Sequence, residues 1–272
     1  MNREKEMSPE FNNEAIREQY QAVLRELLEQ RIAMVGETAA ESHDPNASVE
    51  QQLESLTLHA EQMRQQQGGK TNEFIIMQGA SGAGKSTIGK ALGLPRFPRH
   101  TDRQPRPGEV DGADYIFISA DEFTAKLEAG DFVGNPAETY GERRGMDRRT
   151  LDSFLAKGGF YIDGSARTPL DFYSDPEYHH HEFLSVFVMP PSFDELVRRL
   201  HARTQQERGR AQTDLQVSSE DQIQKRIAGS VEHLRKALAS QDGKPVTDLF
   251  LVNDHIERAT GIVRSVIGSN KR

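Results

Sequence analysis

Near the end of its first third, the sequence reads Gly79-Ala80-Ser81-Gly82-Ala83-Gly84-Lys85-Ser86-Thr87. This fits the pattern G-x-x-x-x-G-K-[ST], whose glycines let backbone N–H groups turn inward around a phosphate. A short apolar run at residues 73–77 precedes the motif and predicts a buried strand. The residues from Lys85 onward predict the first turns of a helix, whose N-terminal dipole also favours an anion. In this context the motif predicts a phosphate-binding loop between a strand and a helix.

The residue types within this loop suit a nucleoside triphosphate that binds together with magnesium. Lys85 is placed to reach the β- and γ-phosphates and to act as a catalytic residue, and the hydroxyl of Ser86 is placed to bind Mg²⁺. The predicted ATP-binding residues of the loop are Gly79, Ala80, Ser81, Gly82, Ala83, Gly84, Lys85, Ser86 and Thr87.

The composition narrows the classes of function that remain open. The net charge of −8 argues against general nucleic-acid binding, which requires a basic surface. The chain has no cysteine, so disulfides and thiolate metal sites are excluded. No stretch approaches the length of a membrane span, and the N-terminal residues lack the apolar core of a signal peptide. We therefore predict a cytoplasmic protein with no nucleic-acid or membrane partner.

The part of the chain before the loop predicts two helices. Apolar residues recur at helical spacing over residues 11–35 and, more thinly, over residues 49–67, and Asp44-Pro45-Asn46 interrupts the pattern between them. Residues 1–70 are therefore predicted to form a helical hairpin that packs on the rest of the chain or pairs with another copy of it. A regulatory module that binds a protein partner is the alternative. This extension carries no catalytic motif, so we expect that deleting it leaves the chemistry intact.

A turn-rich stretch after the loop carries a second set of candidate binding residues. It reads Thr101-Asp102-Arg103-Gln104-Pro105-Arg106-Pro107-Gly108-Glu109-Val110-Asp111-Gly112-Ala113-Asp114-Tyr115-Ile116-Phe117. Its two arginines are three positions apart, and arginine offers planar paired donors that fit phosphate oxygens. A glutamate is placed to hold one guanidinium in position, and a tyrosine closes the segment. From these residues alone, the stretch is either an anion-binding loop or a solvated charged loop.

This stretch resembles the T-R-x-x-R-x-G-E-x-x-G-x-x-Y-x-F signature of guanylate kinases, and the resemblance extends over about residues 72–267. In that family the two arginines and the tyrosine hold the phosphate of the acceptor nucleotide. The resemblance therefore implies that Arg103, Arg106 and Tyr115 bind the acceptor phosphate. It also implies that Glu109 belongs to the acceptor site, where it orients an arginine.

The resemblance also shows where this chain departs from the family in the residues that read the base. The family's F-x-E, whose glutamate reads guanine, is replaced by a segment that ends in Gly134, and the serine four positions before Arg103 is Arg99. Tyr140, an acceptor-binding residue by resemblance, is followed two positions later by Glu142 in place of the family's Ser or Thr. We therefore expect looser or altered base selectivity. The carboxylates that could substitute are Glu138, Glu142, Asp102 and Asp163.

The second half of the chain supplies the remaining candidate residues by the same resemblance. Asp163 ends a predicted core strand and is assigned to the acceptor site, with a role left open between the acceptor base and Mg²⁺. The motif P-P-S-x-x-x-L-x-x-R-L-x-x-R, followed later by K-R, implies a lid at about residues 201–219 whose arginines stabilise the transferring phosphoryl group. Asn253 is implied to lie near the adenine of ATP. The predicted catalytic arginines are Arg199, Arg203 and Arg226.

Two further runs of charged or metal-binding residue types are interpreted as surface features. The arginines among residues 143–149 are assigned to the exposed face of a helix that ends near Gly158. Tyr178-His179-His180-His181 invites a metal, but adjacent histidines rarely converge on one ion. We therefore predict a surface turn there, before the next strand.

The motifs and the resemblance together predict an α/β fold, that of a P-loop kinase with a parallel five-stranded core sheet. Residues 71–272 are assigned to the kinase domain, with an acceptor-binding subdomain at about residues 99–150, and residues 1–70 to the hairpin. The implied reaction is phosphoryl transfer from ATP, with Mg²⁺, to a nucleoside monophosphate, and GMP is the leading acceptor. Two alternatives stay open: a kinase for another phosphorylated acceptor such as ribose 1,5-bisphosphate, and a non-catalytic binding module. The intact Gly84-Lys85-Ser86 argues against the binding module.

Overall fold

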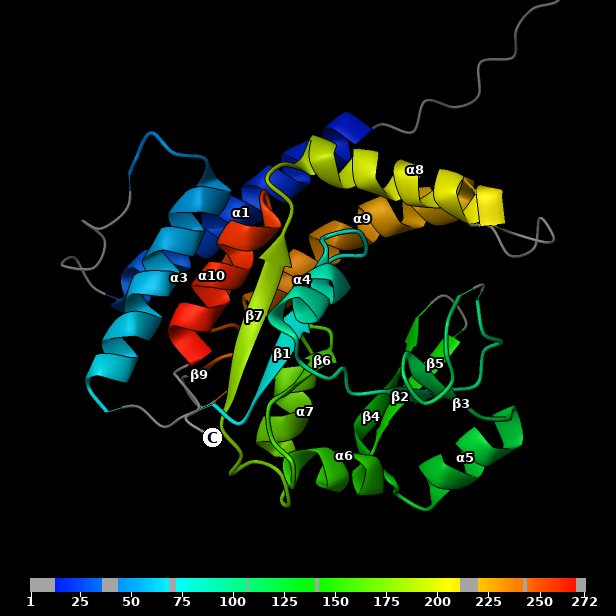
Figure 1. Cartoon of the computed structure of the whole chain (residues 1–272). Coiled ribbons are helices and arrows are strands. Elements are labelled where there is room, and N and C mark those ends of the chain that lie inside the picture. The colour runs from blue at the N-terminus through cyan, green and yellow to red at the C-terminus, as the bar shows by residue number, and fades with distance from the viewer. Residues whose placement is uncertain are drawn as a thin grey trace, which may run out of the picture.

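The computed structural model describes residues 13–35, 44–68, 72–106, 108–139, 142–210, 220–241 and 244–267. At its centre is a parallel sheet in the order β10-β7-β1-β6 (Figure 1). Its strands are β1 (Phe74–Gln78), β6 (Phe160–Asp163), β7 (Phe183–Met189) and β10 (Leu249–Val252). Every residue of β1, β7 and β10 is buried, as expected of apolar runs that helices cover on both faces.

The fifth strand expected in this sheet is reduced, among the described residues, to a single parallel bridge between Arg96 and Tyr161. The amide of Phe97 donates to the carbonyl of Tyr161 at 2.8 Å, and the amide of Tyr161 donates to the carbonyl of Pro95 at 3.0 Å. Proline cannot donate to a ladder. Pro95 and Pro98 flank the bridge, so the pairing does not extend further along β6.

Helices cover both faces of the core sheet. α4 (Lys85–Leu92) and α10 (Ile256–Ile267) pack on one face. α7 (Thr168–Ser174) and α9 (Glu220–Ala237) pack on the other. This layering places the loop after β1 at the carboxyl edge of the sheet, which is where open α/β sheets bind ligands.

A second four-stranded sheet lies beside the core (Figure 1). Its order is β3-β2-β5-β4, and it is mixed because β2 pairs parallel with β3 and antiparallel with β5. Two helices, α5 and α6, pack against it. These elements are β2 (Arg99–Thr101), β3 (Tyr115–Phe117), α5 (Ala120–Glu128), β4 (Phe132–Thr139), β5 (Glu142–Asp147) and α6 (Arg148–Leu155). They occupy the range expected for the acceptor-binding subdomain.

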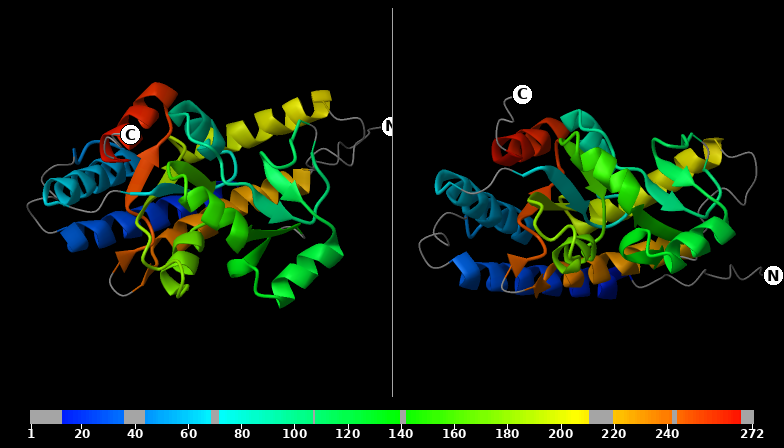
Figure 2. Two further views of the ribbon diagram at one scale, coloured as in Figure 1. Left: turned by 60° about the horizontal axis from the view of Figure 1, so that its bottom comes forward. Right: turned by 90° about the horizontal axis from the view of Figure 1, so that it is seen from below.

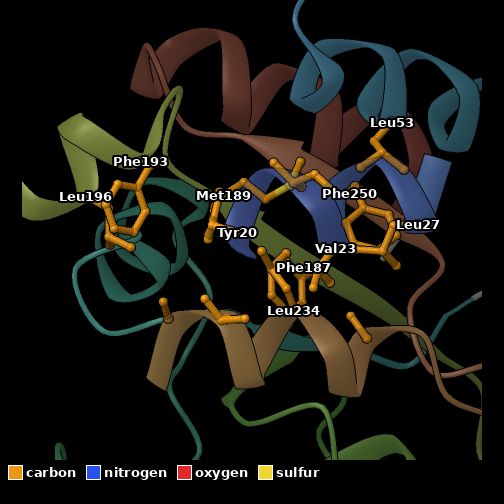
Figure 3. Packing of buried hydrophobic residues seen from close by; sticks show 14 of the residues in the cluster. Tyr20, Val23, Leu27, Leu53, Phe187, Met189, Phe193, Leu196, Leu234 and Phe250 are labelled. Atoms are coloured by element: carbon orange, nitrogen blue, oxygen red, sulfur yellow. The ribbon is translucent and has the colours of Figure 1, made fainter. Parts of the chain in front are cut away.

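The N-terminal helices are part of the main hydrophobic core. α1 (Asn13–Val35) packs against α3 (Val49–Gln66) and lies alongside α9, as Figure 2 shows. Its apolar side chains share one cluster with Phe187 and Phe250 of the core sheet (Figure 3). The hairpin thus packs on the rest of its own chain. The buried apolar residues of α1 are Tyr20, Val23, Leu24 and Leu27.

α3 completes the edge of the core sheet at β10. The hydroxyl of Thr57 accepts a hydrogen bond from the amide of Phe250 at 3.0 Å, and Oε1 of Glu54 accepts one from the amide of Val252 at 2.7 Å. Arg258 holds the glutamate in place through a contact of 2.6 Å between its Nη1 and Oε2 of Glu54. An edge strand otherwise presents unpaired N–H groups. Side chains of the N-terminal extension therefore take the place of a further strand.

Two smaller features complete the described structure. A short hairpin, β8 (Ser240–Gln241) and β9 (Lys244–Pro245), follows α9. The predicted surface turn before β7 is confirmed, since His179 and His180 are exposed and lie in a turn. Within the described ranges, no helix is long and apolar enough to cross a bilayer.

Candidate active site

The loop between β1 and α4 has a backbone that requires glycine at two positions. Gly79 and Gly84 have φ angles of 124° and 101°, in the left-handed region. A Cβ atom at Gly79 would collide with the carbonyl of Val188, and one at Gly84 would collide with the side-chain amide of Asn253. Glycine therefore lets the loop fold tightly against β7 and the segment after β10.

Lys85, the first residue of α4, extends back over this loop. Its Nζ donates to the carbonyl oxygens of Gly79 and Ala80 at 2.9 and 3.1 Å, and it lies 3.8 Å from Oδ1 of Asp163. Burial raises the pKa of Asp163, but the positive charges of Lys85 and of neighbouring arginines, Arg96 first among them, hold the net pKa below its usual value. Asp163 is therefore an ionised carboxylate beside the predicted phosphate site.

The donor set beside this loop fits a magnesium ion. The hydroxyl of Ser86 lies at the exposed N-terminus of α4, and it makes no hydrogen bond with any other described residue. Hydroxyl and carboxylate oxygens are ligands that Mg²⁺ accepts, usually together with water and substrate phosphates. Ser86 and the ionised Asp163 are the protein groups that supply such oxygens.

The loop is held from its other side by α8 (Phe193–Arg210) and by the segment after β10. Nδ2 of Asn253 donates to the carbonyl of Ala83 at 2.8 Å, and Nη2 of Arg199 donates to the carbonyl of Asn253 at 2.8 Å. Glu195 in turn accepts from Nε of Arg199 at 2.7 Å. The structure thus brings Asn253 and Arg199 to the loop. Asn253 contacts the backbone of the loop, and Arg199 contacts Asn253.

Arg203 and Arg226 lie on the two helices that flank the predicted lid. Residues 201–210 continue α8, and α9 begins at Glu220, so residues 211–219 of the lid lie outside the described residues. Arg203 is exposed on α8, and Arg226 is half-buried on α9. α8 and α9 contact each other, so the two arginines lie on neighbouring helices.

The predicted acceptor loop is held together by Glu109. Its two oxygens accept from Nη1 and Nη2 of Arg103 at 2.7 and 2.6 Å, and Oε2 also accepts from the backbone amide of Arg106 at 2.8 Å. The Arg103 side chain is 8% exposed, and its guanidinium carbon lies 4.8 Å from the ring centroid of Tyr115. A bidentate carboxylate thus orients the guanidinium. Tyr140, the remaining predicted residue of this group, lies outside the described residues.

Three further arginines surround Tyr115, and the sequence analysis did not assign them to the site. The guanidinium carbons of Arg96 and Arg144 lie 5.0 and 5.9 Å from the Tyr115 ring. Burial raises the pKa of Tyr115, but Arg99, Arg144 and Arg96 together lower it below its usual value. Two of them, Arg96 and Arg99, could have been noticed in the sequence, because the run Arg96-Phe97-Pro98-Arg99 leads directly into β2.

The interpretation of residues 143–149 as one exposed helix face was wrong. Arg143 and Arg144 belong to β5, and α6 begins only at Arg148. Nε of Arg143 lies 2.6 Å from Asp102, and Nη2 of Arg148 lies 2.7 Å from Asp175. Strand pairing with β2 and β4 determines the positions of the first two arginines, and a local helical pattern could not reveal it.

His233 is a second residue that the sequence analysis missed. Burial, together with the charges of Lys85 and Lys236, lowers its pKa to about 4. Its Nδ1 is buried and has no hydrogen-bond partner among the described residues. α9 therefore carries a neutral imidazole within electrostatic range of the lysine of the phosphate-binding loop.

The chain is similar in sequence to known guanylate kinases. The family model described as guanylate kinase matches residues 71–270. A guanylate kinase of Symbiobacterium thermophilum is 32% identical over 207 residues, which cover 73% of this chain and 85% of that protein. One of Geobacter metallireducens is 33% identical over 200 residues, covering 71% of this chain and 87% of that protein. The crystal structure of guanylate kinase from Anaplasma phagocytophilum aligns with a TM-score of 0.49 at 22% identity, covering 72% of this chain and 85% of that one.

Proposed function

The chain belongs to the guanylate kinase family, and on that premise we propose that it transfers the γ-phosphoryl group of ATP to a nucleoside monophosphate. GMP is the first candidate acceptor, because the relatives that cover most of the chain are guanylate kinases. We further propose that the enzyme acts in the cytoplasm, where ATP and nucleoside monophosphates are both available.

One observation carries the proposal: a continuous series of contacts joins the phosphate-binding loop to the acceptor loop. Nζ of Lys85 lies 3.8 Å from Asp163, whose other oxygen lies 3.4 Å from Nη2 of Arg96. Arg96 stacks on Tyr115, and Arg103 lies over the same ring. The donor and acceptor phosphates would therefore meet between these two loops, beside groups of opposite charge.

Positioning and charge neutralisation account for the chemistry that this site needs. The attacking atom is a phosphate oxygen that is already anionic, so no general base is required. Lys85 is proposed to neutralise the β- and γ-phosphates, and Arg103 and Arg106 to hold the acceptor phosphate in line. Mg²⁺, held by Ser86 with Asp163 nearby, would neutralise further charge on the donor phosphates.

Arg199, Arg203 and Arg226 are proposed to approach the transferring group from α8 and α9. Arginine is suited to this role because it stays charged and its donors match phosphate oxygens. Arg199 already contacts the carbonyl of Ala83 in the loop, at 3.4 Å. Closure of the lid over the phosphates would bring the other two arginines in and exclude water.

A second candidate acceptor is a phosphorylated sugar such as ribose 1,5-bisphosphate. The observation that favours it is the excess of arginine at the acceptor site. Arg99 makes no ion pair with any described residue, and Nε of Arg144 is buried without a partner among them. Burial, and then the charges of Arg99 and Arg103, lower the pKa of Arg144. These groups could neutralise a second phosphate on the acceptor.

Steady-state kinetics with an acceptor panel test the proposal. The panel is GMP, dGMP, IMP, AMP, UMP and ribose 1,5-bisphosphate, each with Mg·ATP. Turnover of GMP with the highest kcat/KM supports the first candidate, and turnover of ribose 1,5-bisphosphate alone supports the second. A folded protein that binds ATP but phosphorylates none of the six would instead favour the non-catalytic binding module.

Replacing Arg106 with alanine should raise KM for the acceptor about tenfold or more while KM for ATP changes less than about threefold. Its Nη2 is 2.7 Å from Glu142, beside the Arg103–Glu109 pair of the acceptor loop, and no described contact joins it directly to the phosphate-binding loop. A hydrogen bond to a charged group is worth about 1.5–3 kcal/mol, which corresponds to this factor. Arg103→Ala should act in the same direction.

The matched control is Arg149→Ala, since Arg149 is exposed on α6 of the same subdomain. Both KM values should stay at the wild-type level in this variant. Equal increases of both KM values in Arg106→Ala would mean that the acceptor loop has been assigned wrongly.

A further inference from the structure

A cavity of about 740 Å³ lies between β4, α7 and the end of α9. Its lining includes Gly134 and Asn135 of β4, Asp171 of α7 and Lys236 of α9. Cavities of this size accommodate small ligands. Its lining combines two carboxylates, those of Asp171 and Asp175, with basic side chains, so it suits a polar ligand.

This cavity adjoins the proposed transfer site along two elements. Ala166 and Arg167 line it, and they follow Asp163 of β6 after a short turn. Lys236 lies one helical turn beyond His233, whose pKa the charge of Lys85 lowers. The cavity therefore lies where the part of an acceptor remote from the transferred phosphate would extend.

Asp171 is the carboxylate that the fold brings to β4. Gly134 has a φ angle of 62°, and a Cβ atom there would collide with the carboxylate of Asp171. The backbone N–H of Asn135 donates to this carboxylate, and Nε of Arg167 lies 3.4 Å from its Oδ1. The pairing of β4 with β5 is interrupted between Val133 and Ala137. The absence of a side chain at Gly134 and the break in pairing together leave room for the Asp171 carboxylate beside β4.

The other carboxylates considered for base recognition are engaged elsewhere or exposed. Glu142 contacts Arg103, Arg106 and Arg144, and Asp102 pairs with Arg143. Asp163 pairs with Lys85 and Arg96. Glu138 is exposed on β4. Among these candidates and Asp171, only Asp171 both lines the cavity and is largely buried, with its side chain 14% exposed.

We propose that Asp171 is a specificity-determining residue that accepts hydrogen bonds from N1–H and the N2 amino group of a guanine base bound in this cavity. The inference rests on the proposed function, because it assigns a base-reading group to the same acceptor site. An ionised carboxylate has acceptors only, so it matches the two adjacent donors of guanine. Adenine presents an acceptor at N1 and is disfavoured. Hypoxanthine keeps the N1 donor but lacks the amino group.

The ability of Asp171 to accept hydrogen bonds from guanine depends on its ionisation, and therefore on pH. Burial raises its pKa to about 6, with Asp175 adding to the rise, while Arg167 and the N–H of Asn135 oppose it. Arg148 of α6 and Lys236 of α9 also face the cavity. Asp171 is therefore an ionised acceptor at pH 8 and a protonated acid at pH 5.

The test compares kcat/KM for GMP and IMP in the wild type and in Asp171→Asn. The ratio of GMP to IMP should fall about tenfold or more in the variant, since an amide cannot accept from both guanine donors. Asparagine still accepts from the N–H of Asn135, so the variant should fold, which its melting temperature checks. Glu128→Gln, at an exposed position of α5, is the control and should keep the wild-type ratio.

The wild type supplies an independent measurement. Its GMP to IMP ratio should be higher at pH 8 than at pH 5, and groups that act on both substrates alike cancel in the ratio. An unchanged ratio in folded Asp171→Asn, with GMP still phosphorylated, overturns the role of Asp171 and leaves the proposed function intact. A wild-type enzyme that phosphorylates no nucleoside monophosphate overturns both.

Discussion

Replacing Lys85 with alanine should lower kcat by about a thousandfold or more while the protein remains folded. Nζ of Lys85 lies over the loop that is proposed to surround the donor phosphates, and it is the only lysine of that loop. A principal charge-stabilising group in phosphoryl transfer is worth about 10³–10⁵ in rate. The measurement is kcat with saturating ATP and acceptor, together with the melting temperature of the variant.

Lys90→Ala is the matched control. Lys90 is exposed on the same helix, α4, and its replacement removes the same positive charge. It should retain the wild-type kcat. If Lys85→Ala kept more than about a tenth of the wild-type kcat, Lys85 would not stabilise the transferring phosphoryl group and the proposed mechanism would be wrong.

Deleting residues 1–68 should abolish stable folding, in contrast to the expectation from sequence that residues 1–70 can be removed without loss of activity. The deletion would uncover Phe187 and Phe250 in the main hydrophobic cluster. It would also remove the acceptors that Thr57 and Glu54 offer to the amides of β10. Circular dichroism and size-exclusion chromatography measure the loss. A soluble truncated protein with a wild-type melting temperature would show that the extension is not part of the core.

A graded version of this prediction uses one buried side chain of α1. Leu27 is fully buried, so Leu27→Ala should lower the free energy of unfolding by about 2–5 kcal/mol. Glu29→Ala is the control, since Glu29 is exposed on the same helix and its replacement should leave stability nearly unchanged. Urea denaturation of the full-length variants measures both effects.

The features that the sequence determined by itself are those whose residues are neighbours along the chain. The motif from Gly79 to Thr87, with a strand before it and a helix after it, follows from local spacing and from the backbone freedom of glycine. The pairing of Arg103 with Glu109 is of the same kind, because the two residues lie six positions apart in one turn-rich loop. The family follows from these same motifs.

Tertiary structure alone decided which distant residues complete the site and the core. Asp171 lies against Gly134, the charge of Lys85 acts on His233, and Thr57 accepts from Phe250, a residue 193 positions away. No periodicity specifies which strand a helix will cover. That choice is made when apolar faces from the whole chain are buried together, and polar groups carried by those faces then find their partners.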